Sequence, residues 1–500
     1  MTFVYPRRMG RKKSQALMSS ARHACLVEAP HPVNIAWRVL SVDHERLSPL
    51  DTAFLRLESP QAPMHLGALV TFQPRQRIPP ARLLAVLGER IARIPALRQR
   101  VRTTWLPPGG AAWTPDTTFD LSRHVHLHRL QRGKDALTML VGKLIAGPLD
   151  LSRPLWQIHL MTGLPDRRFA LLIKLHHAMA DGLRTVELGL RLFDGFTDRG
   201  PDSTDARPPR PAHGIAALAR SAMELPHALS VAASTASIAA SVLTHVRLAA
   251  LLPSAPGNSA RTATAKQPPA TARRLALVRL DAQDVKQVRQ RCGGTDHDVL
   301  LAVITGALRR WRLANDQRPK DLTLRAFIPV SRRSRTTQSQ RHNVLSGYLC
   351  DLPIQHEDPI AMLHHVRAAM DRNKAAGFAR GPGAFPVLAE RIPAPAQHLT
   401  IPLLRRAGPL LFDTMITNVP IPSRPLTLAG APLQHVYPIA PLAHGQTLGI
   451  ALSTYRASVH IGLHADHHAV PDLDRLADAI PTALAALTDS ISPASAAAVG

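Results

Sequence analysis

The chain has 500 residues, which is long for a single hydrophobic core, so we expect two domains or subdomains. Its formal net charge of +26 favours an anionic partner: a membrane surface, a nucleic acid or the phosphate groups of a substrate. The sequence has no zinc-finger spacing and no basic-region zipper, which argues against sequence-specific nucleic-acid binding. A membrane surface is the favoured partner, because each basic residue near an anionic leaflet contributes about 1 kcal/mol.

Residues 1–45 are predicted to be a basic, disordered extension. It carries a basic cluster made of Arg7, Arg8, Arg11, Lys12 and Lys13. An unstructured extension or a misassigned start codon is favoured over a surface-binding arm. Cys25, Cys292 and Cys350 show no pairing pattern and no apolar signal segment occurs, so we expect free thiols in a reducing cytoplasm.

A strand-to-helix turn is predicted near residue 176. Residues 169–175 form a short β-prone apolar run, and apolar residues at helical spacing follow at Leu183, Val186, Leu190 and Phe193. The intervening residues 176–182 read His-His-Ala-Met-Ala-Asp-Gly. Because neighbouring side chains at a strand end point to opposite faces, we expect one histidine to do chemistry and the other to pack. An imidazole titrates near neutral pH, so the exposed histidine is a candidate general base.

Residues 197–272 are rich in Pro and Ala and are predicted to be a crossover linker that contains a helix. Residues 228–244 lack charges, but they are Ala and Ser rather than Leu and Ile, so we do not expect a transmembrane helix. Ile238, Val242 and Val246 share a helix face that suits either a lipid interface or packing on the protein's own surface.

The second half opens with a predicted strand at residues 275–280 and a helix around Val285 and Val288. Thr295 and Asp298 form a capping box, which predicts a helix start and makes Asp298 an N-cap partner. Two histidine groups occur in the chain: His124, His126 and His128 alternate along a predicted strand, and His464, His467 and His468 cluster near the C-terminal end. Neither group has cysteine or carboxylate partners at metal-ligand spacing, so no metal is expected.

The motif at residues 176–182 resembles the HHxxxDG signature of CoA-dependent acyltransferases of the chloramphenicol acetyltransferase type and of peptide synthetase condensation domains. Further blocks resemble the bacterial wax ester synthase/diacylglycerol acyltransferase family in order and spacing. They are residues 47–54, 64–67, 148–156, 329–333, 343–344 leading to 352–353, 417–420, and a final strand closing on 465–466. Several ordered blocks are far more specific than one short motif.

The fold that this resemblance implies is α/β, with two chloramphenicol acetyltransferase-like sandwich lobes at residues 46–196 and 273–490 and a tail at 491–500. The lobes would meet at a channel with His177 at its middle. CoA would enter from one side and the acceptor from the other. The alternating strand and helix patterns of both halves are compatible with this arrangement.

The resemblance implies direct acyl transfer from a long-chain acyl-CoA to diacylglycerol or a fatty alcohol, without cofactor or metal. His177 is then the general base and His176 packs inward. Asp181 fixes the loop by accepting a hydrogen bond or through contact with an Arg that the sequence does not identify, and Gly182 permits a turn where a side chain would crowd. The absence of a G-x-S-x-G elbow argues against an acyl-enzyme hydrolase. We expect the protein to associate peripherally with membranes or lipid inclusions in the cytoplasm.

Candidate pocket residues are Pro154, Leu155, Trp156, His297 and Asn418, although core packing explains the apolar ones equally well. In the resembled family an Asn that has been suggested to stabilise the oxyanion usually occupies the position of His297. A histidine N–H can also donate a hydrogen bond, but its bulk and titration differ. Two rival functions stay open: a condensation-type enzyme using a carrier-bound acyl group, and a catalytically silent lipid-surface protein.

Overall fold

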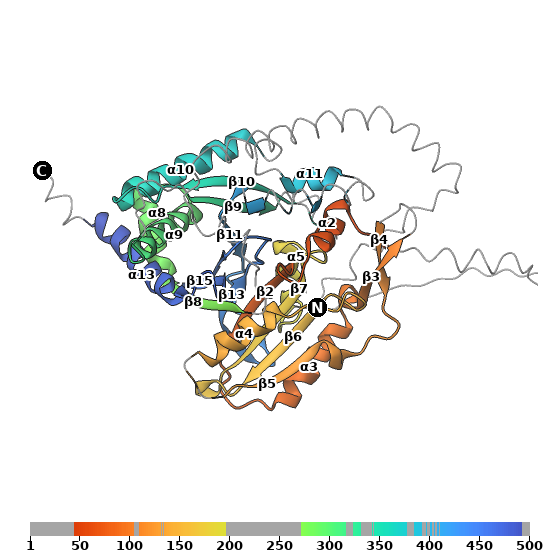
Figure 1. The fold of residues 1–500 in the computed structure, drawn as a ribbon. Helices are drawn as coiled ribbons and strands as arrows, with labels where there is room; N and C mark the ends of the chain where they lie inside the picture. The colour runs from red at the N-terminus through yellow and green to blue at the C-terminus, as the bar shows by residue number, and fades with distance from the viewer. Residues whose placement is uncertain are drawn as a thin grey trace, which may run out of the picture. The chain divides into compact units, whose positions relative to one another are not determined.

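The computed structural model describes residues 45–104, 110–131, 133, 135–196, 272–316, 324–331, 343, 345–377, 385–392, 397, 401–402, 405, 408–409 and 411–492. The basic cluster at residues 7–13, Cys25, and the predicted linker up to residue 271 lie outside the described residues. Figure 1 shows the described elements around two large mixed sheets. This arrangement confirms the predicted α/β class.

The first sheet has six strands in the order β12-β13-β2-β7-β6-β5. Its strands are β2 (His65–Phe72), β5 (Val125–Arg129), β6 (Trp156–Thr162), β7 (Phe169–His176), β12 (Thr427–Leu428) and β13 (Ala431–Ile439). Every residue of β7 is buried, which is expected for a central strand covered on both faces. Leu171 and Ile173 pack on the side of α3 (Pro80–Ala92), whereas Ala170 and Leu172 pack on the side of α4 (Ala136–Ala146).

The second sheet also has six strands, in the order β10-β9-β11-β14-β15-β8. They are β8 (Arg273–Asp281), β9 (Leu324–Ser331), β10 (Leu345–Leu352), β11 (Thr414–Pro420), β14 (Leu448–Tyr455) and β15 (Ser458–Asp466). Figure 1 shows helices grouped beside this sheet, namely α8 (Ala282–Cys292), α9 (Asp296–Leu313), α10 (Pro359–Ala376) and α13 (Leu473–Ser490). Their apolar faces and the sheet share one hydrophobic core.

Smaller elements flank the two sheets. The third sheet has the order β1-β4-β3. Its strands are β1 (Glu45–Arg46), β3 (Gln99–Thr104) and β4 (Gly110–Pro115), and the short helices are α2 (Pro49–Leu57), α5 (Gly182–Leu190), α11 (Phe385–Arg391), η1 (Pro95–Arg98), η2 (Leu121–Arg123) and η3 (Pro165–Arg167). Helix α2 begins with a capping box between Ser48 and Asp51, which satisfies backbone donors at its start. This helix supplies several residues of the site described below.

Strands from the second half of the chain complete the first sheet, because β13 pairs antiparallel with β2. Residues 273–490 are predicted to form the second lobe as one block, but β12 and β13 from this range pair within the first sheet. At Gly462 a Cβ atom would lie 2.1 Å from the carbonyl oxygen of Pro438, so β15 passes against β13 at a residue without a side chain. Local hydrophobic patterns do not reveal which sheet a buried strand joins.

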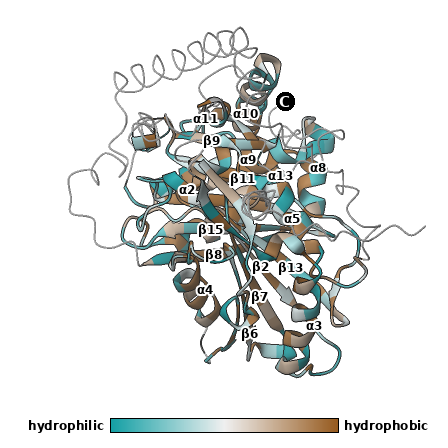
Figure 2. Ribbon diagram, turned by 90° about the vertical axis from the view of Figure 1, so that its right-hand side faces the viewer, coloured by the Kyte–Doolittle hydropathy of each residue, from teal (hydrophilic) through white to brown (hydrophobic). Residues whose placement is uncertain are grey.

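Predictions for single elements agree with the structure where their signals are local. The predicted strand at residues 169–175 is β7, and the helix with apolar spacing after it is α5. The capping box of Thr295 and Asp298 starts α9. Figure 2 shows hydrophobic residues along the central strands, as expected for buried sheets.

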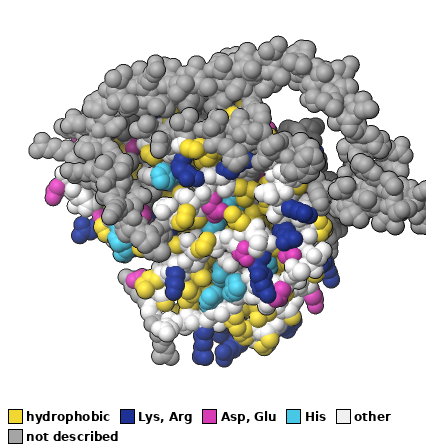
Figure 3. All heavy atoms as spheres, turned by 45° about the vertical axis from the view of Figure 1, so that its right-hand side comes forward, with side chains coloured by type: hydrophobic (Ala, Val, Ile, Leu, Met, Phe, Trp, Pro, Cys, Tyr) yellow, Lys and Arg dark blue, Asp and Glu magenta, His cyan; other side chains and the backbone are white. Residues whose placement is uncertain are grey.

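The charged residues of the described surface are dispersed. On the face seen in Figure 3, Lys and Arg side chains are scattered among acidic and hydrophobic ones. The net charge of the chain therefore does not produce a single basic patch on that face of the described residues. No helix in the described part of the chain combines the length and apolar character needed to cross a membrane.

Candidate active site

The HHxxxDG motif occupies the turn between β7 and α5. Asp181 is the N-cap of α5, where its side chain accepts a hydrogen bond from the Arg184 backbone N–H at 2.8 Å. Its burial is complete, with an exposed fraction of 0%. The structure thus places Asp181 at the start of the helix that follows the two histidines.

Gly182 is the first residue of α5 and lines the cavity described below. A Cβ atom at this position would meet no atom within 4 Å, and the backbone does not adopt a positive φ. The prediction that a side chain would crowd the turn at Gly182 is wrong, because the protein leaves open space where its Cβ atom would lie.

His176 is fully buried on the side of β7 that faces α4. Its Nδ1 accepts a hydrogen bond from the Ala178 backbone N–H at 3.0 Å, so Nε2 carries the proton, and this nitrogen lies 3.3 Å from Glu58 Oε2. Glu58 also contacts His65 Nε2 at 3.1 Å through its other oxygen. His65 lies opposite His176 in the β2–β7 register. Glu58 therefore bridges the two histidines.

The charge state of Glu58 follows from this bridge. Burial by itself would raise the pKa of its carboxyl group, but the contacts from His176 and His65 outweigh it and lower the pKa to about 2. Glu58 is therefore an anion at neutral pH. Lys174, also fully buried on this side, donates to the carbonyl oxygen of Leu144 at 3.0 Å and to that of Gly147.

His177 follows the end of β7 and lies at the cavity wall. Its backbone N–H donates to the Met64 carbonyl at 2.8 Å, and its own carbonyl accepts from Asn343 Nδ2 at 2.7 Å. The ring stacks on Phe54, with centroids 3.9 Å apart and planes inclined by 18°. Nδ1 is the buried ring nitrogen, so Nε2 is the nitrogen that a molecule in the cavity can reach.

Burial lowers the pKa of the His177 imidazole to about 4, although a hydrogen bond to its own backbone and the charge of Asp181 act in the opposite direction. The imidazole is therefore neutral at pH 7. A neutral imidazole with a reachable nitrogen can accept a proton from a hydroxyl group. The structure thus gives the two adjacent histidines different surroundings: His177 at the cavity and His176 among buried polar groups.

A cavity of about 820 Å³ extends from His177 between residues of both halves of the chain. Most of its wall is apolar, with Phe54, Leu57, Leu183, Val186, Phe327, Ile328, Met415 and Val419 among the lining residues. The polar groups in the wall include His297, Lys374, Arg405, Asn418, His444 and Gln446. A mostly apolar cavity of this size with a few polar groups is typical of sites for small organic ligands.

The predicted pocket residues divide into two groups. His297 and Asn418 line the cavity, whereas Pro154, Leu155 and Trp156 are absent from its wall and are buried in the first lobe. The indole Nε1 of Trp156 donates to the Leu97 carbonyl at 2.7 Å. The Leu155 carbonyl accepts from the His176 backbone N–H at 2.9 Å, so this segment supports the end of β7 from behind.

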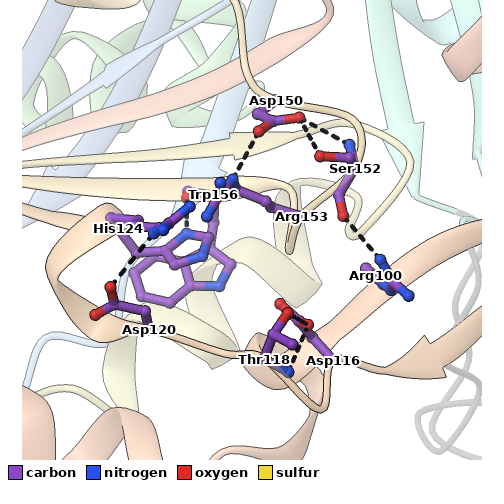
Figure 4. A network of polar contacts seen from close by, with 10 residues as sticks. Arg100, Asp116, Thr118, Asp120, His124, Asp150, Ser152, Arg153 and Trp156 are labelled. Atoms are coloured by element: carbon purple, nitrogen blue, oxygen red, sulfur yellow. Dashed lines mark hydrogen bonds and ion pairs between the residues drawn. The ribbon is translucent and has the colours of Figure 1, made fainter.

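Polar contacts around residues 150–153 hold the chain just before Trp156 (Figure 4). Asp150 accepts hydrogen bonds from the Ser152 backbone N–H at 2.9 Å and from Arg153 Nε at 2.7 Å. Arg100 reaches the Ser152 carbonyl at 3.4 Å from β3. This network fixes the chain where it enters β6, and its residues are not among those that line the cavity. The residues of this block therefore have a structural role.

Comparison with known proteins identifies the family. The wax ester synthase/diacylglycerol acyltransferase catalytic domain matches residues 47–300, and the WS/DGAT C-terminal domain matches residues 342–488. The chain belongs to this family. A probable diacylglycerol O-acyltransferase of Mycobacterium tuberculosis is 31% identical over 458 residues, covering 88% of this chain and 95% of the relative. A second from the same species is 30% identical over 462 residues, covering 89% and 99%.

Solved structures agree with the fold of this WS/DGAT family member. A wax ester synthase/diacylglycerol acyltransferase from Marinobacter aquaeolei has a TM-score of 0.62 at 24% identity and covers 89% of this chain and 99% of its own. The starter condensation domain of rhizomide synthetase has a TM-score of 0.56 at 15% identity, with 91% and 97% covered. The predicted family, fold and enzyme class are confirmed: the protein is an acyltransferase.

Several site residues of this WS/DGAT protein were missed by the sequence analysis. Phe54, Asp51 and Asn343 lie inside blocks that carried the family resemblance, but no role followed from their residue types. Phe54 and Asn343 contact His177, and Asp51 contacts Asn343. Each contact joins segments more than a hundred residues apart, such as the 166 residues between Asn343 and His177. Glu58 follows the first of these blocks and is an acidic residue, a type that is rarely buried unless it is paired. Its position was the only available signal that it pairs with a buried residue.

The two histidine groups make ordinary structural contacts. His124 Nδ1 is 2.9 Å from the Trp156 carbonyl, and its ring stacks on that indole at 4.7 Å. His128 Nε2 lies 3.1 Å from His159 Nδ1, and His464 Nδ1 lies 2.7 Å from the Ala440 carbonyl. Within the described ranges, no group of three or more His, Cys, Asp or Glu side chains is arranged to hold a metal ion.

Proposed function

We propose that this enzyme transfers a long-chain acyl group from acyl-CoA to the hydroxyl of diacylglycerol or of a fatty alcohol, with His177 as general base. The observation that carries the proposal is a neutral imidazole, with one nitrogen accessible, in the wall of a large apolar cavity. An apolar wall suits long hydrocarbon chains on donor and acceptor. The names of the Mycobacterium relatives support diacylglycerol as an acceptor.

The proposed reaction is balanced without a cofactor or metal. His177 Nε2 takes the proton of the acceptor hydroxyl as its oxygen attacks the thioester carbonyl. The carbon–sulfur bond then breaks, and the imidazolium returns the proton to the sulfur, so CoA leaves as the thiol. General-base assistance contributes about a hundred- to ten-thousand-fold in rate. Asp181 holds the start of α5 and His176 the end of β7, while neither contacts the substrate.

Peripheral association with a membrane or lipid-inclusion surface in the cytoplasm is part of the proposal. The acceptors are lipids, and the net charge of +26 favours attraction to an anionic surface. Leu183, which lines the cavity, is also 36% exposed and offers an apolar contact at the surface. Binding to anionic and neutral vesicles at low and high salt would test this part separately.

Thiol release from palmitoyl-CoA, with diolein and hexadecanol as separate acceptors, tests the catalytic proposal. We expect acceptor-dependent release that is lost in His177→Ala and kept in His468→Ala, which removes an exposed histidine. Equal release by wild type and a folded His177→Ala would eliminate His177 as the base. Transfer only from an acyl-carrier protein would favour a condensation-type enzyme. Lipid binding without any acyl transfer would favour a catalytically silent surface protein.

A further inference from the structure

Asp51 is a buried carboxylate that touches neither the cavity nor the surface. Its exposed fraction is 1%, and it lies in the first turn of α2. Oδ1 accepts hydrogen bonds from both the backbone N–H, at 3.2 Å, and the side-chain Nδ2 of Asn343. The two residues are 292 positions apart in the chain. Asp51 therefore fixes a residue of the second half against a helix of the first half.

Asn343 uses its amide nitrogen twice. Nδ2 donates one hydrogen to Asp51 and the other to the carbonyl oxygen of His177, which is 2.7 Å away. Asn343 itself has an exposed fraction of 0%. The three residues form a continuous chain of hydrogen bonds from the buried carboxylate to the backbone of the base. A charged acceptor polarises the amide and strengthens its second hydrogen bond.

The carbonyl of His177 matters for the ring because Asn343 holds, at this oxygen, the backbone from which the imidazole projects. Its Nδ1 is buried, while Nε2 is the nitrogen open to the cavity. Displacing the carbonyl would turn the ring and move Nε2 away from the acceptor hydroxyl. A displacement of about 1 Å at a reacting group can cost about a hundredfold in rate.

Burying a carboxylate is unfavourable, and burial is the main reason that the pKa of Asp51 is raised to about 6. An apolar pair of similar size would fill the same space without this penalty. Stability therefore does not explain why Asp51 and Asn343 are buried at this position. The contact with His177 supplies the reason.

We propose that Asp51, acting through Asn343, is a positioning residue that orients the base His177. The proposal rests on the role of His177 proposed above. It also makes the orientation of the base depend on contact between the two halves of the chain, because Asn343 and Asp51 come from different halves. Neither residue lines the cavity, so neither touches the substrate.

Steady-state kinetics of five variants test this role in the full-length protein. We expect Asn343→Ala and Asp51→Ala to lower kcat about 10- to 100-fold with KM changed less than about threefold. Asp51→Asn keeps an acceptor oxygen and should retain kcat within about threefold. The double variant Asp51→Ala/Asn343→Ala should be no slower than either single variant, because the residues act in one chain. Asn343→Ser serves in place of Asn343→Ala if the latter does not fold.

Asn315→Ala is the matched control, since Asn315 Nδ2 donates to Asp472 at 2.8 Å in the second lobe, away from His177. It should lower the unfolding midpoint without lowering kcat. Wild-type kcat in folded Asn343 variants, a change confined to KM, or multiplicative effects in the double variant would overturn the positioning role. His177→Ala in the same assay separates the two proposals. If His177→Ala is active, His177 is not the general base. If His177→Ala is inactive but Asn343→Ala is fully active, only the positioning role of Asp51 and Asn343 is refuted.

Discussion

Phe54 lies parallel to His177, with ring centroids 3.9 Å apart and an interplanar angle of 18°. The aromatic ring comes from α2, the same helix that carries Asp51 and that is followed directly by Glu58. Helix α2 thus contacts the ring face of the base through Phe54 and the backbone partner of the base through Asp51. Glu58, the residue after the helix, contacts the neighbouring histidine. The stack covers one face of the imidazole and keeps water from it, which contributes to the low pKa of His177.

Replacing Phe54 should therefore change both the rate and its pH dependence. Burial penalises the charged imidazolium, so hydration of the ring in Phe54→Ala should raise the pKa of His177 from about 4 towards its ordinary 6.5. The acidic limb of the kcat profile should then move to higher pH, and kcat at pH 7 should fall about tenfold as the ring loses its orientation. The measurement is kcat from pH 4.5 to 8.

Phe327→Ala is the control for that experiment, because Phe327 lines the same cavity from the second half and packs against Phe412, with ring centroids 5.1 Å apart. It should alter KM for long-chain substrates and leave the acidic limb in place. An unchanged limb in Phe54→Ala would mean that the stack does not set the protonation of His177.

Glu58→Gln should destabilise the protein, because one carboxylate serves both His65 and His176. A Gln side chain offers one acceptor oxygen, so one buried histidine N–H loses its partner at a cost of about 1–3 kcal/mol. The pKa of Glu58 is lowered to about 2, so its stabilisation is present above pH 4.5 and is lost as the pH falls towards 2. Urea unfolding between pH 3 and 7 should show a flatter acid dependence in Glu58→Gln.

Glu357→Gln removes a comparable carboxylate in an exposed ion pair, since Glu357 is 77% exposed and lies 2.7 Å from Arg309. It should change the unfolding free energy by less than about 1 kcal/mol. Equal losses in the two glutamine variants would show that the bridge between His65 and His176 contributes no more than a surface contact.

The parts of the site that depend on neighbouring residues could be predicted from the sequence. The apolar run before His176 and the helical spacing after Gly182 place the motif at the turn that β7 and α5 form. The capping box at Thr295 likewise depends on residues three positions apart. In each case a few adjacent residues determine the hydrogen bonds concerned.

The contacts that set the chemistry of His177 could not be predicted in this way. Phe54 and Asn343 reach His177 only through tertiary packing, and a residue type alone does not identify such a partner. The same reason explains Trp156, which was expected near the pocket and is instead a buried first residue of β6 in the core of the first lobe. An apolar residue in a block that resembles the family suits a core or a cavity equally well until the packing is known.

Trp156→Leu tests that structural role. The variant loses the hydrogen bond from the indole to the Leu97 carbonyl and leaves space beside His124. We expect a loss of about 3–5 kcal/mol in unfolding free energy, with kcat and KM of the folded fraction within about threefold of wild type. A large change in KM with little loss of stability would contradict the structural role and indicate that Trp156 contacts the substrate.

Buried neutral histidines should make the protein sensitive to mild acid. Burial lowers the pKa of His464 to about 4, whereas in the unfolded chain it binds a proton near pH 6.5. The unfolded state therefore binds more protons between these values, and stability falls as the pH decreases through this window. Between pH 7 and 5 the contribution of His464 is about 2 kcal/mol.

Comparing urea unfolding at pH 7 and pH 5 in wild type and His464→Gln measures this contribution. Gln can donate to the Ala440 carbonyl but does not titrate, so the variant should lose about 2 kcal/mol less on acidification. His468→Gln, at an exposed position, should lose as much as wild type. Identical acid dependence in all three proteins would contradict the assigned neutral state of His464.

His297 lines the cavity from the first turn of α9, and burial lowers its pKa, so it offers the hydrogen-bond donor of a neutral imidazole. If that N–H stabilises the oxyanion of the transition state, His297→Leu should lower kcat about a hundredfold with little change in KM, because the bond forms only as charge develops. His297→Asn supplies an amide donor and should retain most of kcat. His444→Leu removes a second cavity histidine and should leave kcat unchanged. Full activity in His297→Leu would exclude this donor and assign oxyanion stabilisation to another group in the cavity wall.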